Sequence, residues 1–356
     1  MRSAICASAP FASRGPSPRR ARAPRRLPVA SAAPAPDDTP ACVVVIGASG
    51  RTGSAVCRHC VSLGLPVRAC TRTGLADPTT ILGDDAPAAV VPWSSPLVRA
   101  VAADVTVPDQ LPAVVAGASL VVFAATAPAG GDPDAVDHRG LAETARACIA
   151  AGVPRLVVVS GAGVTKPASP AYRFLNLFGG RMDAKVAGED AVRDLYRRAA
   201  DANRRAPRDE GDREGGGKEG YEPTPSYTIV RPSGLLDGPG TGPGGLATNQ
   251  GDEAAGFVDR ADVAACCVAA GRSPATRGCT FEVYAAGTAV ATETLSLADI
   301  LSDPKAAAVA EALTQPTRAA RRLLGGGRET PGTKVTARER RGGSWDALFE
   351  GLQPDA

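Results

Sequence analysis

The chain has 356 residues, of which 44% are hydrophobic and only 4% aromatic, and its formal net charge is +3. A core made mainly of Val, Leu, Ile and Ala suits a buried parallel sheet, whose strands are short aliphatic runs. No apolar stretch approaches the ~20 residues that a membrane-spanning helix needs, so we expect a soluble protein.

The first 36 residues differ from the rest, because they contain seven arginines and no acidic residue and are rich in Ala, Ser and Pro. This composition is typical of an organelle transit peptide and lacks the apolar stretch of a secretory signal. We expect residues 1–36 to direct the protein to the chloroplast stroma, with the mitochondrion as the alternative. A disordered basic arm that binds nucleic acid is the competing interpretation. Without the seven arginines the charge of +3 becomes −4, which gives no electrostatic reason to expect a nucleic-acid or membrane partner.

Short aliphatic runs alternate with longer, helix-compatible stretches along the rest of the chain. The predicted strands are 42–46, 66–71, 98–103, 120–125, 155–160, 227–231 and 280–284. The predicted helices are 52–63, 108–116, 136–151, 180–200 and 260–270. This alternation predicts an α/β fold, a doubly wound parallel sheet of the Rossmann type, in a single domain over residues 41–300.

Three segments depart from this pattern. Residues 77–96 are rich in Pro, Gly and Ala and predict an irregular excursion, whereas residues 201–225 are charged and Gly-rich and predict a disordered insertion. Residues 301–356 form a C-terminal tail. Within it, the apolar residues Trp345, Leu348, Phe349 and Leu352 are spaced for a short amphipathic turn that docks on the domain. A tail that binds a partner protein is the alternative.

The strongest local signal is the segment V-V-V-I-G-A-S-G-R-T-G at residues 43–53, where an apolar strand leads into a Gly-rich turn and a helix. A pyrophosphate can approach backbone N–H groups at a helix N-terminus only where no Cβ intervenes. We therefore predict dinucleotide binding by this turn, with an ordinary strand-to-helix turn as the alternative. The predicted cofactor contacts here are Gly47, Ala48, Ser49, Gly50, Arg51, Thr52 and Gly53.

The end of the second strand indicates which dinucleotide binds. NAD-specific folds place an acid there, but this sequence has Thr71, Arg72 and Thr73. A guanidinium group suits a 2′-phosphate, and Arg51 in the turn is a second candidate for the same phosphate. The predicted cofactor is NADP(H).

The cysteines and histidines give no sign of a metal site. Nine cysteines lack a framework spacing, and only two histidines are present. Cys57 and Cys60 form a C-x-x-C without a second pair, so we expect no metal. The main interpretation is that the cysteines pack as small apolar side chains. Redox regulation through Cys57 and Cys60, or through Cys266 and Cys267, is the alternative.

From residue 42 to residue 284 these motifs together resemble the atypical short-chain dehydrogenase/reductase superfamily. The similarity is to its NAD(P)H-binding branch (NmrA-like and biliverdin reductase B-like), including plant and cyanobacterial members. The resemblance implies that Asp104 and Val105 contact adenine and that Ser160 and Lys185 form the active site. The further cofactor contacts that it implies are Ala124, Ala125, Thr126, Ser160, Lys185 and Pro232.

One position departs from the family pattern. Members with oxidoreductase activity typically carry Tyr-x-x-x-Lys, but the residue four before Lys185 is Arg181. In the usual mechanism the tyrosine transfers the proton and the lysine holds the ribose hydroxyls. Tyr172, in a nearby loop, is one alternative proton donor.

Two functions therefore stay open. The first is an NADPH-dependent reductase that transfers hydride to a small conjugated plastid molecule of the flavin, quinone or tetrapyrrole type. The second is a non-catalytic, NADP(H)-responsive scaffold or assembly factor for plastid redox or photosynthetic complexes, which would have a protein partner.

Overall fold

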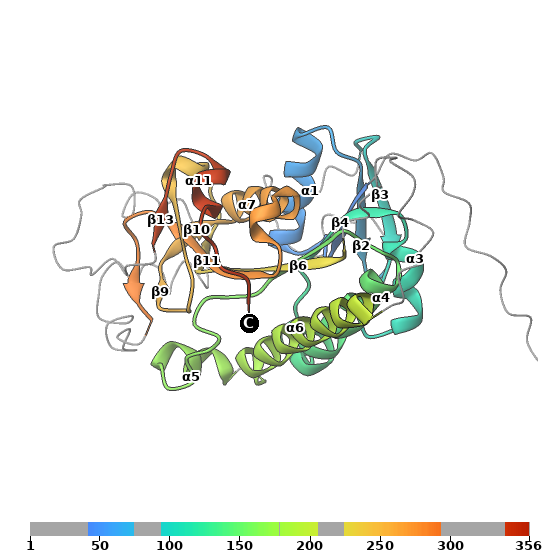
Figure 1. The fold of residues 1–356 in the computed structure, drawn as a ribbon, viewed down its shortest axis with the longest axis horizontal. Helices are drawn as coiled ribbons and strands as arrows, with labels where there is room; N and C mark the ends of the chain where they lie inside the picture. Colours follow the sequence, from blue (N-terminus) through green and yellow to red (C-terminus); the bar gives the residue numbers. More distant parts are fainter. Residues whose placement is uncertain (1–41, 75–93, 178, 206–223, 293–338, 356) are drawn as a thin grey trace, which may run out of the picture. The chain divides into compact units, whose positions relative to one another are not determined.

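The computed structural model describes residues 42–74, 94–177, 179–205, 224–292 and 339–355. The transit peptide predicted for residues 1–36 lies outside these ranges, as do most of the excursion at 77–96 and most of the insertion at 201–225. The core of the described part is a nine-stranded sheet with the order β13-β8-β11-β6-β5-β4-β1-β2-β3 (Figure 1). Its strands are β1 (Cys42–Ile46), β2 (Val67–Thr71), β3 (Val98–Ala102), β4 (Ala118–Phe123), β5 (Arg155–Val159), β6 (Ser226–Pro232), β8 (Leu246–Asn249), β11 (Cys279–Ala285) and β13 (Arg340–Arg341).

The sheet is parallel from β3 to β11, and β8 and β13 add an antiparallel edge. All seven predicted strands are present, with each end within two residues of its predicted position. The prediction of a doubly wound parallel sheet in a single domain is therefore confirmed. Strand β1 lies between β2 and β4 in the sheet. The chain therefore continues from β1 to β2 on one side and from β4 to β5 on the other side. Ligands of such sheets bind outside the carboxyl ends of the strands at this switch point.

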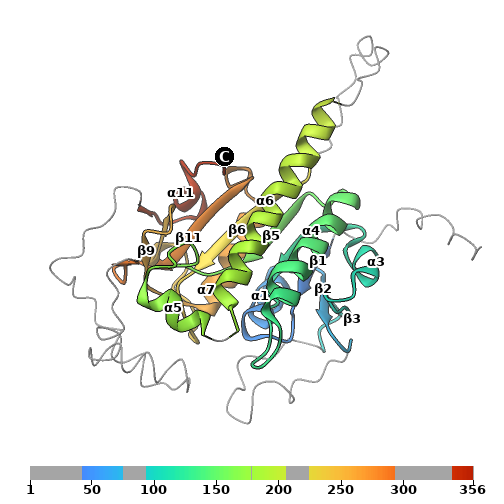
Figure 2. The ribbon, with the colours of Figure 1, turned by 90° about the horizontal axis from the view of Figure 1, so that it is seen from below.

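Helices cover both faces of the sheet, as Figures 1 and 2 show from two directions. One face carries α1 (Arg51–Ser62), α7 (Arg260–Arg272) and α11 (Trp345–Phe349), and its core contains Val45, Val230 and Phe281. The other face carries α3 (Leu111–Val115), α4 (Leu141–Ala150) and α6 (Arg181–Arg205), with Val44 and Ile229 in its core. Alternate residues of each strand thus enter opposite cores, as expected for a sheet buried on both sides. Among the helices of the described ranges, none has the length and hydropathy that a membrane span requires.

The remaining elements are short. A 3-10 turn, η1 (Pro108–Gln110), precedes α3, and a π-helical turn, η2 (Asp134–Gly140), precedes α4. Helix α5 (Pro170–Asn176) lies between β5 and α6. Further 3-10 turns and two small strand pairs complete the fold: η4 (Pro243–Gly245), η5 (Pro274–Thr276), β7 (Gly234–Leu236) with β10 (Phe257–Asp259), and β9 (Ala254–Ala255) with β12 (Val290–Ala291).

Helix α6 corrects one predicted boundary. It continues to Arg205, so the first five residues of the predicted insertion are helical. Asp194 pairs with Arg197 and Arg198 at 2.6 Å each, and Asp201 pairs with Arg204. Such pairs at spacings of three and four residues stabilise a helix, and here they lie in its C-terminal part.

The C-terminal segment docks on the domain, as the spacing of its apolar residues predicts. Leu348 and Phe349 are fully buried, and the Phe349 ring lies 5.6 Å from that of Phe281. The Asp355 carboxylate accepts hydrogen bonds from Tyr227 Oη at 3.0 Å and Thr280 Oγ1 at 2.6 Å. The apolar face of α11 is therefore buried against this chain, which leaves it unavailable to a partner protein.

Candidate functional site

The Gly-rich turn connects β1 to α1 through very close backbone contacts. Gly47 has a φ of +82°, and a Cβ on it would lie 2.7 Å from the backbone N and Cα of Ala125. A Cβ on Gly53 would lie 2.1 Å from the carbonyl oxygen of Gly47. Gly50 precedes α1 without a side-chain cap, and the first turn of the helix has no acid. The positive end of the α1 dipole is thus left for an external anion, as dinucleotide binding requires.

The ends of β2 and β3 carry the residues predicted to recognise the adenosine half. Arg72 and Thr73 are exposed after buried Thr71. Asp104 Oδ1 accepts hydrogen bonds from Thr106 N at 2.9 Å and Oγ1 at 2.7 Å. These bonds, with a smaller effect of the charge on Arg72, lower the pKa of Asp104. The structure therefore brings Arg72 and Asp104 to the same edge of the sheet.

Two other predicted contacts have structural surroundings that the sequence did not indicate. The Arg51 guanidinium pairs with Asp237, which also pairs with Arg260 at 2.6 Å. Val105 is buried against η2, where a Cβ on Gly140 would lie 2.6 Å from Val105 Cγ2.

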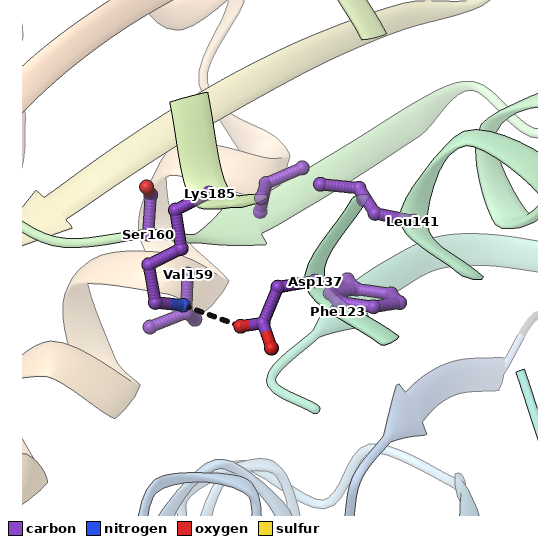
Figure 3. A pocket seen from close by; sticks show the side chains of 7 residues that line it. Phe123, Asp137, Leu141, Val159, Ser160 and Lys185 are labelled. Atoms are coloured by element: carbon purple, nitrogen blue, oxygen red, sulfur yellow. Dashed lines mark ion pairs between the residues drawn. The ribbon is translucent and has the colours of Figure 1, made fainter. Parts of the chain in front are cut away.

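A small pocket lies beyond the carboxyl ends of β4 and β5 (Figure 3). The predicted active-site residues Ser160 and Lys185 both line it. Its other lining residues are Phe123, Asp137, Leu141, Val158 and Val159. Strand β4 leads from this pocket to Ala124, Ala125 and Thr126, next to the Gly-rich turn. Pro232 ends β6, and its carbonyl oxygen accepts a hydrogen bond from Ala162 N at 2.9 Å, in the loop after Ser160.

Asp137 is the site residue that sequence reasoning missed. It is 2% exposed, and Lys185 Nζ lies 2.9 Å from its Oδ1 (Figure 3). It also accepts hydrogen bonds from Thr126 Oγ1 at 2.7 Å and Ala127 N at 2.9 Å. A signal was available in the sequence, because Asp137 occupies the same helical stripe as the apolar residues Leu141, Ala145 and Cys148. A carboxylate on a buried stripe indicates a specific cationic partner.

Arg181, which occupies the position of the family's tyrosine, is bound to the loop after β4. It donates to Ala127 O at 3.0 Å and to Thr126 Oγ1 at 3.4 Å. The other tyrosine considered, Tyr172, lies in α5 and donates its hydroxyl to Asp183. Burial and this hydrogen bond raise its pKa to about 12. Tyr172 does not line the pocket, so the structure does not bring it to Ser160 and Lys185.

A glycine allows helix α6 to pack closely against η2. A Cβ on Gly188 would lie 2.2 Å from the carbonyl oxygen of Asp137. Lys185 is three residues earlier, on the side of α6 that faces η2. The absence of a side chain at Gly188 thus sets the separation of the two helices, and with it the distance between Lys185 and Asp137.

Behind Ser160 lies a buried group of charged residues. Burial acts to raise the pKa of Glu189, but ion pairs with Arg231 at 2.6 Å and Arg193 at 2.9 Å outweigh it and lower that pKa. Ser160 Oγ is buried and makes no hydrogen bond of ordinary geometry within the described ranges, yet it contributes to lowering the Glu189 pKa. Glu282 is fully buried, 3.4 Å from Arg231, and burial raises its pKa to about 8.

The eight cysteines in the described ranges are buried and unpaired by disulfides. Burial raises the pKa of Cys57 well above its usual value, that of Cys60 to about 12 and that of Cys267 to about 12. Thiolates are disfavoured at these positions, which agrees with the packing interpretation.

Residues 47–198 match a family model described as NAD(P)H-binding. The fold of the chain is of the Rossmann type. A chloroplastic protein of Arabidopsis thaliana, described as uncharacterized, is 32% identical over 210 residues, which are 56% of this chain and 61% of that protein. The chain thus matches less than two thirds of that relative's length.

Several solved structures are similar to part of this chain. The oxidoreductase ylbE from Lactococcus lactis is 18% identical with a TM-score of 0.48, covering 69% of this chain and 92% of ylbE. An anaerobillin reductase from Escherichia coli O157:H7 is 20% identical with a TM-score of 0.48. The match covers 68% of this chain and 97% of the reductase. A short-chain dehydrogenase/reductase from Veillonella parvula in complex with NADP is 15% identical with a TM-score of 0.46. The match covers 70% of this chain and 96% of that protein.

The contact at Gly188 gives a stability prediction for this fold. Gly188→Ala should destabilise the protein by about 1–3 kcal/mol, because the new Cβ must push α6 away from η2. Urea unfolding measures the change. Gly244→Ala is the matched control, because a Cβ there meets nothing within 4 Å. Equal stability of both variants would show that α6 does not depend on this close approach.

Glu282 gives a prediction of pH dependence. Its pKa is raised in the folded protein, so its contribution favours folding below the unfolded pKa and is lost as pH rises through about 8. The difference in unfolding free energy between the unmodified protein and Glu282→Gln should therefore fall between pH 5 and pH 8 and then stay level. Urea unfolding at several pH values measures it. A difference that grows with pH would mean that Glu282 is ionised when buried.

Proposed function

We propose that the chain is an NADPH-dependent reductase of the atypical short-chain dehydrogenase/reductase kind. It transfers hydride to a small conjugated plastid molecule of the flavin, quinone or tetrapyrrole type. The observation that carries the proposal is the pocket in which Lys185, paired with buried Asp137, lies beside Ser160 at the carboxyl edge of the sheet. That edge is also where the Gly-rich turn meets Ala125.

The residues present fit a nicotinamide dinucleotide. Gly47 and Gly53 leave no room for a Cβ, and the first turn of α1 itself contains no acidic residue. The family model that matches residues 47–198 is itself described as NAD(P)H-binding. The absence of an acid after β2, together with exposed Arg72, supports NADP(H) over NAD(H). When bound, the cofactor would supply the hydride.

Each polar group of the pocket has a part in the proposed reaction. Lys185 would hold the ribose hydroxyls, and Asp137 fixes its ammonium group in place. The buried Ser160 hydroxyl makes no hydrogen bond of ordinary geometry in the described ranges, and it would donate to the acceptor atom of the substrate.

A conjugated acceptor suits this set of groups. The charge left by hydride transfer can spread over such a molecule, so no proton donor has to act at the same moment. The pocket as described contains no tyrosine to fill that role.

The composition of residues 1–36 and the chloroplastic relative support a plastid location. One observation favours the second candidate function, a non-catalytic scaffold that responds to NADP(H). Arg181 replaces the tyrosine, and it is engaged with Ala127 and Thr126.

Oxidation of NADPH in the presence of flavin, quinone and tetrapyrrole acceptors tests the reductase proposal. Absorbance at the nicotinamide band should fall with at least one acceptor class. Ser160→Ala should lower kcat by about 10²-fold or more, because it removes a donor to the developing negative charge. Arg173→Ala, an exposed substitution on α5, is the control. Tight NADPH binding without turnover of any acceptor would reject the reductase and favour the scaffold.

Arg72 tests the choice of cofactor. Arg72→Ala should weaken NADPH binding by about tenfold or more and leave NADH binding nearly unchanged, since only NADPH carries the 2′-phosphate. Nicotinamide fluorescence titrations with both dinucleotides measure this. Arg146→Ala on α4, where Arg146 pairs with nearby Glu143, controls for the loss of one positive charge. An unchanged preference for NADPH in Arg72→Ala would show that another residue selects the cofactor.

A further inference from the structure

The loop at residues 237–242, between β7 and η4, is fixed on the N-terminus of α7. Gly240 N donates to Asp259 Oδ2 at 3.1 Å. Thr241 N donates to both carboxylate oxygens of Asp262 at 2.9 Å, and Gly242 N donates to Asp262 Oδ1 at 2.8 Å. The carboxylates of Asp259, which precedes α7, and of Asp262 in its first turn thus set the path of the loop by binding its backbone.

The first residue of this loop is held between two arginines of different helices. Asp237 Oδ2 pairs with Arg51, the first residue of α1, and Asp237 Oδ1 lies 2.6 Å from Arg260 Nη1 on α7. The Arg260 side chain is 12% exposed, whereas those of Arg51 and Asp237 are 33% and 39% exposed. The contact therefore joins the Gly-rich turn to α7, but it stays accessible to a ligand.

The two guanidinium groups of this cluster repel each other. Burial, and then the charge on Arg260, lower the pKa of Arg51 to about 10. Burial lowers the pKa of Arg260 to about 10, although the charge on nearby Asp259 opposes the shift. An anion that contacts both Arg51 and Arg260, as Asp237 does, is therefore electrostatically favourable.

We propose that Arg260 is a second phosphate-binding residue of the dinucleotide site and that Asp237 is a built-in competitor of the pyrophosphate. This inference rests on the proposed function, because it takes the ligand to be a dinucleotide. Carboxylates and phosphates bind the planar guanidinium fork in the same way, so one can replace the other. Asp237 occupies the arginine pair in the structure, and a pyrophosphate at the N-terminus of α1 would take its place there.

The position of the group favours the pyrophosphate over the 2′-phosphate. Arg51 lies at the N-terminus of α1, where the Gly-rich turn would receive the pyrophosphate. The residue placed for the 2′-phosphate is Arg72, whose charged neighbour is Asp104. Because NADH and NADPH share the pyrophosphate, Asp237 and Arg260 should affect both cofactors alike.

Nicotinamide fluorescence titrations of the full chain with NADPH and NADH test the proposal. Asp237→Asn should tighten binding of both by about three- to tenfold, because it removes the competing charge, and Arg260→Gln should weaken both by about tenfold. Asp194→Asn is a matched control, since Asp194 also lies between two arginines, Arg197 and Arg198, but on the outer part of α6. Unchanged or weaker binding by Asp237→Asn would reject the competitor role. A change confined to NADPH would reject the pyrophosphate assignment.

Inorganic pyrophosphate separates this inference from the proposed function. The shift of the urea midpoint caused by millimolar pyrophosphate should be largest for Asp237→Asn, smaller for the unmodified protein and smallest for Arg260→Gln. If neither dinucleotide binds, the proposed function fails, but this order of midpoint shifts would still support the anion site. Equal shifts in all three proteins would overturn the inference.

Discussion

The close contact among three backbone segments at the Gly-rich turn is the constraint on which the site depends. A Cβ at Gly47 would lie 2.7 Å from the backbone of Ala125, and one at Gly53 would lie 2.1 Å from Gly47 O. Real Cβ atoms do not approach other atoms so closely, so larger residues would force β1, α1 and the end of β4 apart. Since β4 leads to Thr126 and Thr126 binds Asp137, the same packing fixes the pocket. The Gly-rich turn and the proposed catalytic groups therefore share one rigid support.

The buried charges behind Ser160 extend this support toward the C-terminus. Glu189 binds Arg231 and Arg193, and Arg193 Nε lies 3.0 Å from Asp355 Oδ2. Removing one member of such a group leaves a buried charge without a partner, which costs several kcal/mol. The docked segment at residues 339–355 is therefore part of the environment of Ser160, although Asp355 lies far from it in sequence. The resemblance covered residues 42–284 and gave no sign of this connection.

Most of the fold could be predicted because its strands are aliphatic runs separated by helix-length segments. The missed edge strands show where this signal ends. Leu246–Asn249 is short and follows a Gly- and Pro-rich stretch, and it becomes a strand only by pairing with β11 and Arg340–Arg341. Ser160, Lys185 and the turn were found because they belong to contiguous motifs. Asp137 and Asp237 were missed because their partners are remote in the chain: Arg51 is 186 residues from Asp237, and no local spacing encodes that pair.

Arg181 stands where the family pattern has a tyrosine, and its contacts are structural, with the loop after β4. An arginine stays protonated at any physiological pH, so it cannot replace a tyrosine as a proton donor. Its guanidinium instead binds Ala127 O and Thr126 Oγ1, and both residues also donate to Asp137. Arg181 thus holds the loop that orients the carboxylate, and the carboxylate in turn holds Lys185. A pocket built in this way can place a positive charge and a hydroxyl beside an acceptor, but it has no strong acid to deliver a proton. This balance agrees with the proposed reductase, whose substrate would become a stabilised anion on accepting hydride and would then take its proton from water.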